Sequence, residues 1–249
     1  MNVTTADMGS ARIITWDRQA RRNAWDLETM TALAEALEAA AIDDLVRCAI
    51  VRGAGGHFSA GDDLFAAVEA TPEEWAQTIE AFQRLTRIVL AAPIPVVAAI
   101  DGVCIGGALE FAASCDFRLG TRRSRYGTPE VTIGLVATNA GSVFLPEVLG
   151  ETAARQLLLT GALRDAAWAE RHGFLTEVVD DLDECVTRWS FAFDATSRSA
   201  VARTKSMLNA RHGPGLAEAM DRETEACIDL FAGPDAPAAL AAFAESRRG

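Results

Sequence analysis

Residues 105–115, IGGALEFAASC, form the stretch that most limits how this chain can fold. Two glycines open it, and the small and apolar side chains that follow predict a helix that is apolar on every side. Such a helix must be enclosed by other elements, so the fold needs a core with this helix inside it. One carboxylate, Glu110, lies in its middle. Because a buried carboxylate loses its hydration, Glu110 requires hydrogen bonds, a counter-charge or a chemical task.

Strands and helices alternate along the chain on both sides of this helix. Apolar and β-branched patterning predicts strands at 11–16, 46–53, 95–102 and 115–120, and helices at 26–41 and 71–90. The second of these helices starts with an N-cap at Thr71, Pro72 at its first position and Glu74 at its third. The order predicts an α/β fold with crossover connections. From residue 151 onward the pattern is mainly helical, with one strand predicted at 175–180.

Charge and cysteine content disfavour several classes of protein. The formal net charge of -12 repels polyanions, so we expect no nucleic-acid partner. No apolar run approaches the roughly 20 residues of a membrane span, and the N-terminus lacks the order of a secretory signal. Five widely spaced cysteines without a CxxC pair, beside only 3 histidines, predict free thiols and no metal site. We therefore expect a cytoplasmic protein without a membrane partner.

Two familiar motifs are present only in part. GAGG at 53–56 resembles a dinucleotide-binding loop, but Phe58 occupies the place of the third glycine. Ser59 lies in HFSAG rather than in the GxSxG of a nucleophilic serine. The histidines are expected at the surface or at helix ends: His57, His172 and His212.

Two other turns carry a pattern with chemical meaning. In SAGDDL and in the junction before Gly107, glycines permit sharp turns that leave backbone N–H groups free to face a ligand. Two such donors aimed at one carbonyl oxygen would form an oxyanion hole, although each stretch alone is more often an ordinary turn. Glu110 lies within one helical turn of Gly107, and Glu130 follows Pro129, which predicts a loop. Two carboxylates there could activate water and move a proton, while Glu130 could also be a surface residue.

These motifs and their order resemble the crotonase, or enoyl-CoA hydratase/isomerase, superfamily. The resemblance runs almost the full length of the chain, through RRNA, FSAGDDL, IDGVCIGGALEFAASCD, YGTPEVTIGL, LPEVLG and VARTKSMLNA. It implies a crotonase-like spiral of ββα units over 1–195 and a helical C-terminal region over 196–249. It also implies an acyl-CoA substrate, no cofactor beyond the coenzyme A that the substrate carries, and a homotrimer or a dimer of trimers.

The resemblance also assigns roles to particular residues. The backbone N–H groups of Asp62 and Gly107 match two oxyanion donors, and Glu110 and Glu130 match the catalytic glutamates of enoyl-CoA hydratases. The implied substrate-binding residues are Arg22, Ala24, Ala60, Asp63, Leu64, Gly106, Pro129 and Ile133. The activity implied is hydration of a 2-enoyl-CoA. The alternatives are isomerisation or thioester hydrolysis within the same superfamily, or a non-catalytic, RNA-binding relative.

Three departures from the family pattern concern the substrate. GLVATNAGSVFL stands where hydratases usually have a proline- and glycine-rich stretch, so the wall of the acyl pocket differs. Asp62 places a carboxylate at a position often filled by a small side chain. The C-terminal segment lacks the usual acidic residue before its Ala-Phe pair.

Overall fold

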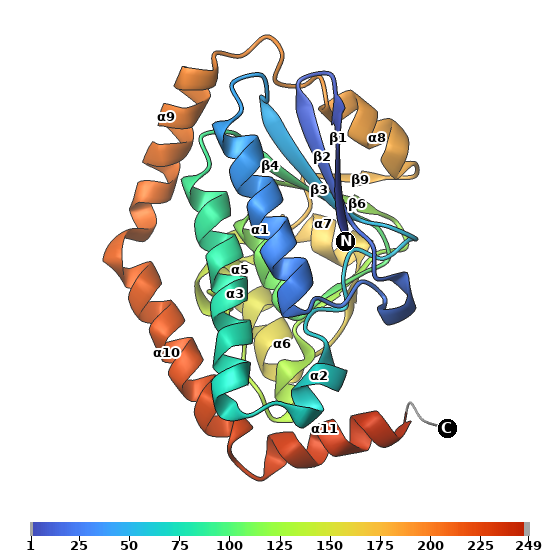
Figure 1. Ribbon diagram of the computed structural model, residues 1–249, viewed down its shortest axis with the longest axis vertical. Helices are drawn as coiled ribbons and strands as arrows, with labels where there is room; N and C mark the ends of the chain where they lie inside the picture. The colour runs from blue at the N-terminus through green and yellow to red at the C-terminus, as the bar shows by residue number, and fades with distance from the viewer. Residues whose placement is uncertain (1, 247–249) are drawn as a thin grey trace.

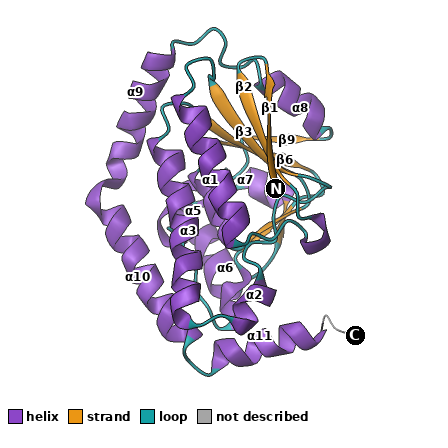
Figure 2. Ribbon diagram, in the orientation of Figure 1, coloured by secondary structure: helices purple, strands orange, loops and turns teal. Residues whose placement is uncertain are grey.

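The computed structural model describes residues 2–246 and contains a large sheet, a small sheet and layers of helices around them (Figures 1 and 2). The large sheet has the order β1 (Val3–Met8), β2 (Ala11–Trp16), β3 (Cys48–Gly53), β4 (Val96–Ile100), β6 (Phe117–Thr121) and β9 (Glu177–Val179). Only the β1–β2 pair in it is antiparallel. The small sheet has the order β5 (Val103–Ile105), β7 (Arg125–Gly127) and β8 (Arg164–Asp165).

Helices cover both faces of the large sheet. They are α1 (Leu27–Ile42), α2 (Leu64–Glu69), α3 (Pro72–Ala91), α4 (Gly107–Ser114), α5 (Gly141–Leu149), α6 (Glu151–Thr160), α7 (Ala166–Arg171), α8 (Leu182–Trp189), α9 (Arg198–Asn209), α10 (Gly213–Phe231) and α11 (Asp235–Ser246). Short 3-10 helices are η1 (Gln19–Arg21), η2 (Pro129–Ile133) and η3 (Ala210–His212). In Figure 1, α9 and α10 run along the outer side of α3, and α11 crosses below α2. The division at residue 195 stays a prediction.

The sequence pattern of each strand explains how the layers form. Alternate residues of the parallel strands point to opposite faces, so Ile14, Val51 and Ala98 join the core that also holds residues of α1, α3 and α4. Their neighbours Ile50 and Val97 pack on the other face with residues of α8. Burial on both faces is what a parallel sheet requires. The predicted α/β architecture with a helical C-terminal stretch is confirmed.

Two local predictions are confirmed in detail. The Thr71 hydroxyl accepts a hydrogen bond from the Glu74 N–H at 3.2 Å, and the Glu74 carboxylate accepts one from the Thr71 N–H at 2.8 Å. This reciprocal pair satisfies two donors that a helix start leaves unpaired. All of α4 is buried, Glu110 included, as its apolar circumference predicts.

Other elements were missing from the sequence prediction or placed wrongly. Strand β1 exposes nearly all its residues at the sheet edge, so it has no buried face for a pattern to reveal. Glu130 lies in η2 rather than in an irregular loop. His212 lies at a helix end as predicted, as the last residue of η3 and the N-cap of α10, but its side chain is only 5% exposed and packs edge-on against Phe144. That burial comes from the packing of the α9–α10 corner on α5, which no local pattern encodes.

A partly buried ion pair attaches α9 to the sheet. The Lys205 ammonium lies 2.6 Å from the Asp116 carboxylate and donates to the Ile94 carbonyl at 3.0 Å. The same Asp116 carboxylate accepts a hydrogen bond from the Val96 N–H at the start of β4. One residue of α9 is thereby tied to the ends of two neighbouring strands.

Within residues 2–246, no single helix is long and apolar enough to cross a membrane. One bent pair, 198–231 with 235–246, meets the length and composition requirement only when its two parts are taken together across a 70° bend.

Candidate active site

The candidate site forms where the loop after β3 meets the junction of β5 and α4. The Ser59 N–H donates to the Val103 carbonyl at 2.9 Å, and the Ile105 N–H donates to the Ser59 carbonyl at 3.2 Å. Gly61 has a φ of +82°, and a β-carbon there would lie 2.8 Å from the Ile105 oxygen. Only glycine tolerates both the left-handed backbone and this approach. The SAG turn is therefore held directly beside Gly107.

The Asp62 N–H and the Gly107 N–H lie on adjoining turns. A β-carbon on Gly61, which precedes Asp62, would lie 3.5 Å from the Gly107 nitrogen. Gly107 is the first residue of α4, where backbone donors have no partner inside the helix. Burial raises the pKa of Asp62 to about 6, and the N–H groups of Asp62 and Gly107 oppose that rise.

Glu110 is held inside the molecule by the backbone after η2. Its Oε2 accepts from the N–H groups of Thr138 at 3.4 Å and Asn139 at 3.3 Å. Its Oε1 is buried and has no hydrogen-bond partner among the described residues. Burial is the largest cause of a pKa well above the ordinary range, and the charges of Glu130 and Glu223 raise it further. An unpartnered buried oxygen is unusual for a purely structural carboxylate.

Glu130 faces the same region from η2. Its Oε2 is buried without a hydrogen-bond partner in the described part of the chain. Burial raises the pKa of Glu130 to about 8, its own N–H opposes the rise, and the charge of Asp62 adds to it. A β-carbon on Gly106 would lie 3.1 Å from its Oε1, so Glu130 sits against the turn that precedes α4. A carboxyl with this pKa carries its proton at neutral pH and can donate it.

A cavity of about 50 Å³ lies against Asp62 and Glu130. It is lined by Ala60, Asp62, Leu64, Trp75, Gly106, Pro129, Glu130, Ile133, Leu135, Val136, Thr138 and Cys227. Behind its wall, the rings of Trp75 and Phe231 stack at 5.1 Å with an angle of 7° between them. The cavity therefore has an acidic side, toward Asp62 and Glu130, and an apolar side closed by aromatic rings.

Seven of the twelve predicted site residues line this cavity, and five do not: Glu110, Gly107, Arg22, Ala24 and Asp63. Arg22 is exposed, with a φ of 51°, and its carbonyl accepts from the Ala60 N–H at 3.1 Å. Ala24 is buried. Asp63 accepts from the Phe65 N–H at the start of α2 and pairs with Arg18 at 2.9 Å. The RRNA turn therefore adjoins the cavity, while Asp63 has a structural task.

Sequence reasoning missed Glu223 of α10. Its two carboxylate oxygens accept from the N–H groups of Ala140 and Ser142, each at 2.8 Å. Those groups follow the N–H groups that hold Glu110, so Glu223 fixes the segment that positions Glu110. Nothing in DRETEAC distinguishes this glutamate from its exposed neighbours, and only its helical spacing from Cys227 could have indicated an inward face. Trp75 and Cys227 of the cavity wall were missed as well.

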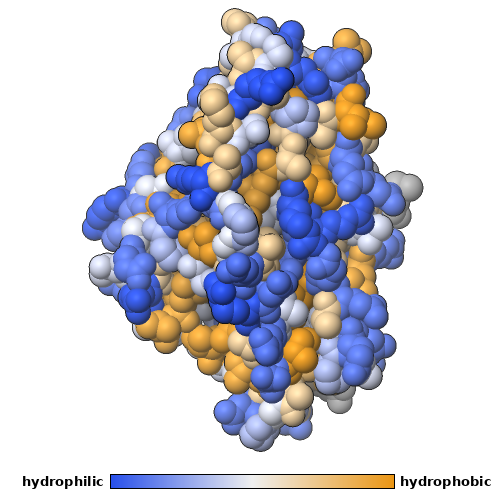
Figure 3. All heavy atoms as spheres, turned by 90° about the vertical axis from the view of Figure 1, so that its left-hand side faces the viewer, coloured by the Kyte–Doolittle hydropathy of each residue, from blue (hydrophilic) through white to orange (hydrophobic). Residues whose placement is uncertain are grey.

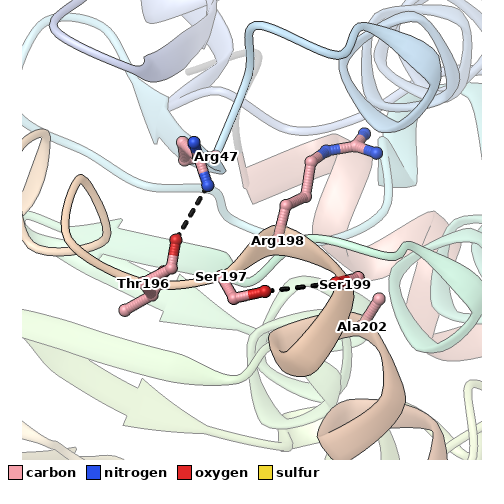
Figure 4. Close-up of a pocket in the computed structure, with 6 residues that line it drawn as sticks. All are labelled: Arg47, Thr196, Ser197, Arg198, Ser199 and Ala202. Atoms are coloured by element: carbon pink, nitrogen blue, oxygen red, sulfur yellow. Dashed lines mark hydrogen bonds between the residues drawn. The ribbon is translucent and has the colours of Figure 1, made fainter.

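A wider hollow of about 510 Å³ lies at the start of α9 (Figure 4). Both guanidinium groups in this hollow already donate hydrogen bonds to backbone carbonyls. Arg47 donates to the Thr196 carbonyl at 2.8 Å, and Arg198 donates to the Ala41 carbonyl at 2.8 Å. Ser197 and Ser199 bond each other at 3.1 Å. Among residues 2–246 there is also no group of three or more His, Cys, Asp or Glu side chains that could hold a metal ion. The acidic cavity is the better candidate for chemistry.

Known proteins with similar sequences share one family description. The model of the enoyl-CoA hydratase/isomerase family matches residues 8–249. The enoyl-CoA hydratase EchA19 of Mycobacterium tuberculosis is 30% identical over 249 residues, which cover 96% of this chain and 92% of that protein. The crotonyl-CoA hydratase of Syntrophomonas wolfei is 29% identical over 235 residues, with coverage of 93% and 90%.

Solved structures match over almost the whole chain. An enoyl-CoA hydratase/isomerase from Xanthobacter autotrophicus has a TM-score of 0.89 and 31% identity and covers 100% of this chain and 93% of its own. An enoyl-CoA hydratase from Bacillus halodurans has a TM-score of 0.90 and 26% identity, with coverage of 97% and 100%.

Proposed function

The chain belongs to the enoyl-CoA hydratase/isomerase family, and within that family we propose that it adds water across the double bond of a 2-enoyl-CoA thioester. The observation that carries this proposal is that the Gly107 N–H lies beside the turn that bears the Asp62 N–H, where a β-carbon on Gly61 would be 3.5 Å from the Gly107 nitrogen. The same two donors would hold the thioester carbonyl oxygen as it becomes an enolate. In other enzymes, loss of one such donor costs about 3 kcal/mol of transition-state stabilisation.

The two glutamates supply the base and the acid. Burial raises the pKa of both, the charge of Glu130 raises that of Glu110 further, and the charge of Asp62 raises that of Glu130, so the pair keeps a proton at neutral pH. Glu110 accepts two backbone hydrogen bonds that favour its charged form, which makes it the base. Glu130 accepts none from any other residue within 2–246, which makes it the acid.

The reaction then balances without a further reagent. Water attacks Cβ while Glu110 takes its proton, the electrons of the double bond move to the carbonyl oxygen, and Glu130 protonates Cα as the enolate collapses. The thioester is the electron sink, so coenzyme A within the substrate is the only cofactor-like group required. The exposed Arg22, beside the cavity, would meet the phosphates of coenzyme A.

A panel of 2-enoyl-CoA esters tests the proposal. The conjugated thioester absorbance should fall with time, and the product should gain the mass of one water. An isomerase would leave the mass unchanged, and a hydrolase would release free coenzyme A. Absence of turnover across the panel would indicate the non-catalytic alternative.

A further inference from the structure

Trp75, near the start of α3, adjoins both the acidic cavity and a second, larger hollow. This hollow has a volume of about 660 Å³ and is bounded by the start of α1, by α2 and by the first turns of α3. Among residues 2–246, Trp75 alone lines both spaces. Its indole therefore forms part of the wall that separates the cavity from the hollow.

Packing holds this indole in place. Trp75 is 6% exposed and stacks on the ring of Phe231 in α10, with 5.1 Å between the ring centroids and 7° between the ring planes. The same cluster of buried residues includes Ile79, Leu135 and Cys227. Because a closely packed side chain cannot move aside without losing contacts, the wall is a fixed part of the core.

The cavity on the catalytic side of this wall is small. One water-sized group needs about 10–15 Å³. A cavity of about 50 Å³ therefore has room for about four groups of that size. That matches the four carbons of a crotonyl group, and a longer acyl chain would have to pass the position of Trp75.

The hollow beyond Trp75 offers a surface that suits a hydrocarbon chain. Apolar side chains line much of it: Trp25, Leu27, Ala66, Ala67 and Ala70. Exposed carboxylates line another part of it: Glu28, Glu69 and Glu74. A chain that reached the hollow would bury methylene groups against the apolar part, so the indole is what keeps long acyl groups from this surface.

We propose that Trp75 limits the length of the acyl group that this protein accepts, by closing the apolar end of the cavity against the hollow. The substrates are then short acyl-CoA thioesters of about four carbons. The inference rests on the proposed function, since it takes the ligand to be an acyl-CoA. Trp75 would contact the end of the acyl group and not the reacting carbons, which makes it a determinant of chain-length specificity.

The test measures binding of two saturated thioesters that cannot be hydrated, butyryl-CoA and octanoyl-CoA, by calorimetry. In the wild-type protein, octanoyl-CoA should bind no more tightly than butyryl-CoA, because its four additional methylenes find no room. Trp75→Ala opens the cavity to the hollow. Since each buried methylene lowers a dissociation constant by about fourfold, octanoyl-CoA should bind this variant at least about tenfold more tightly than butyryl-CoA.

Two further variants guard against a loss of folding. Trp75→Leu keeps an apolar side chain of smaller size, so it should give an intermediate ratio of the two dissociation constants, and it decides the matter if Trp75→Ala does not fold. Trp168→Ala removes a tryptophan of α7 that lines neither the cavity nor the hollow, and it should keep the wild-type ratio. Circular dichroism shows which variants are folded.

The outcomes separate this inference from the proposed function. If the wild-type protein and the folded Trp75 variants bind both thioesters with the same ratio, Trp75 does not limit the acyl length, while the proposed function stands. Octanoyl-CoA binding tenfold more tightly than butyryl-CoA to the wild-type protein would also refute the inference alone. If no folded form binds either thioester, both proposals are wrong.

Discussion

At the scale of single residues, the proposed hydration depends on two carboxyl groups, Glu110 and Glu130, in different protonation states. Replacing either one with glutamine keeps the size of the side chain and removes its ability to gain or lose a proton. Each single change should lower kcat by roughly 10²- to 10⁴-fold. Because the two residues act on one water and one enolate, Glu110→Gln combined with Glu130→Gln should lose much less than the product of the single effects.

The pH profile separates the acid from the base. Glu130 must be protonated to donate to Cα, and with its pKa near 8 it loses that proton as pH rises through this value. Wild-type kcat should therefore fall above about pH 8. Glu110→Gln should keep this descending arm, and Glu130→Gln should lose it. Stopped-flow kinetics at pH 6 to 10 would show the difference, and an unchanged arm in Glu130→Gln would remove Glu130 from the role of acid.

Gly141 offers a second test of Glu110 without changing it. A β-carbon at Gly141 would lie 2.1 Å from the Glu110 Oε1, so Gly141→Ala should push the carboxylate out of place and lower kcat by at least tenfold. Gly215→Ala is the matched control, since a β-carbon there meets nothing within 4 Å and should leave kcat unchanged. Equal kcat in both variants would show that the position of Glu110 does not matter for turnover.

The sequence predicted the residues whose task shows in a local motif, and it missed those that act only through packing. Glu110 stands out because its neighbours are apolar, and the SAGDD turn stands out because Gly61 needs a left-handed backbone. Glu223 and Trp75 reach the site from distant helices, and their surroundings in the sequence are ordinary. No local pattern predicts that the SAG turn lies against Gly107, because that contact depends on how closely two loops approach.

At the scale of elements, the attachment of α9 is open to direct measurement. Lys205→Met removes the buried partner of this ion pair and leaves the partly exposed Asp116 carboxylate without its cation, which should lower the free energy of unfolding by about 1.5–3 kcal/mol. Urea denaturation followed by circular dichroism measures this. Arg203→Met changes an exposed position on the same helix and should shift stability by less than about 0.5 kcal/mol. Equal stabilities of the two variants would show that the pair does not anchor α9.

Elements with two buried faces or a strong cap were predictable, and short ones were not. The parallel strands β3 and β4 are apolar almost throughout, and α3 carries its capping box in the sequence. β5 and β7 have three residues each, too few for a period to show. They form because the SAG turn and the start of α4 must be held together, which is a property of the tertiary fold.

At the scale of the whole molecule, we predict a trimer or a dimer of trimers, on the family resemblance. Exposed apolar side chains on the outer helices support an association: Met207 and Leu208 on α9 and Leu230 on α10. The face on which these helices lie shows apolar groups between polar ones (Figure 3). Light scattering at micromolar concentration should give three or six times the 26.5 kDa of one chain, and a monomer would contradict the prediction.

The most direct test of hydration is the mass of the product formed from a 2-enoyl-CoA in deuterium oxide. The account predicts a 3-hydroxyacyl-CoA that carries one non-exchangeable deuterium at Cα, delivered through Glu130, and a hydroxyl group at Cβ. A product that has deuterium but no added oxygen, or the release of free coenzyme A, would contradict it.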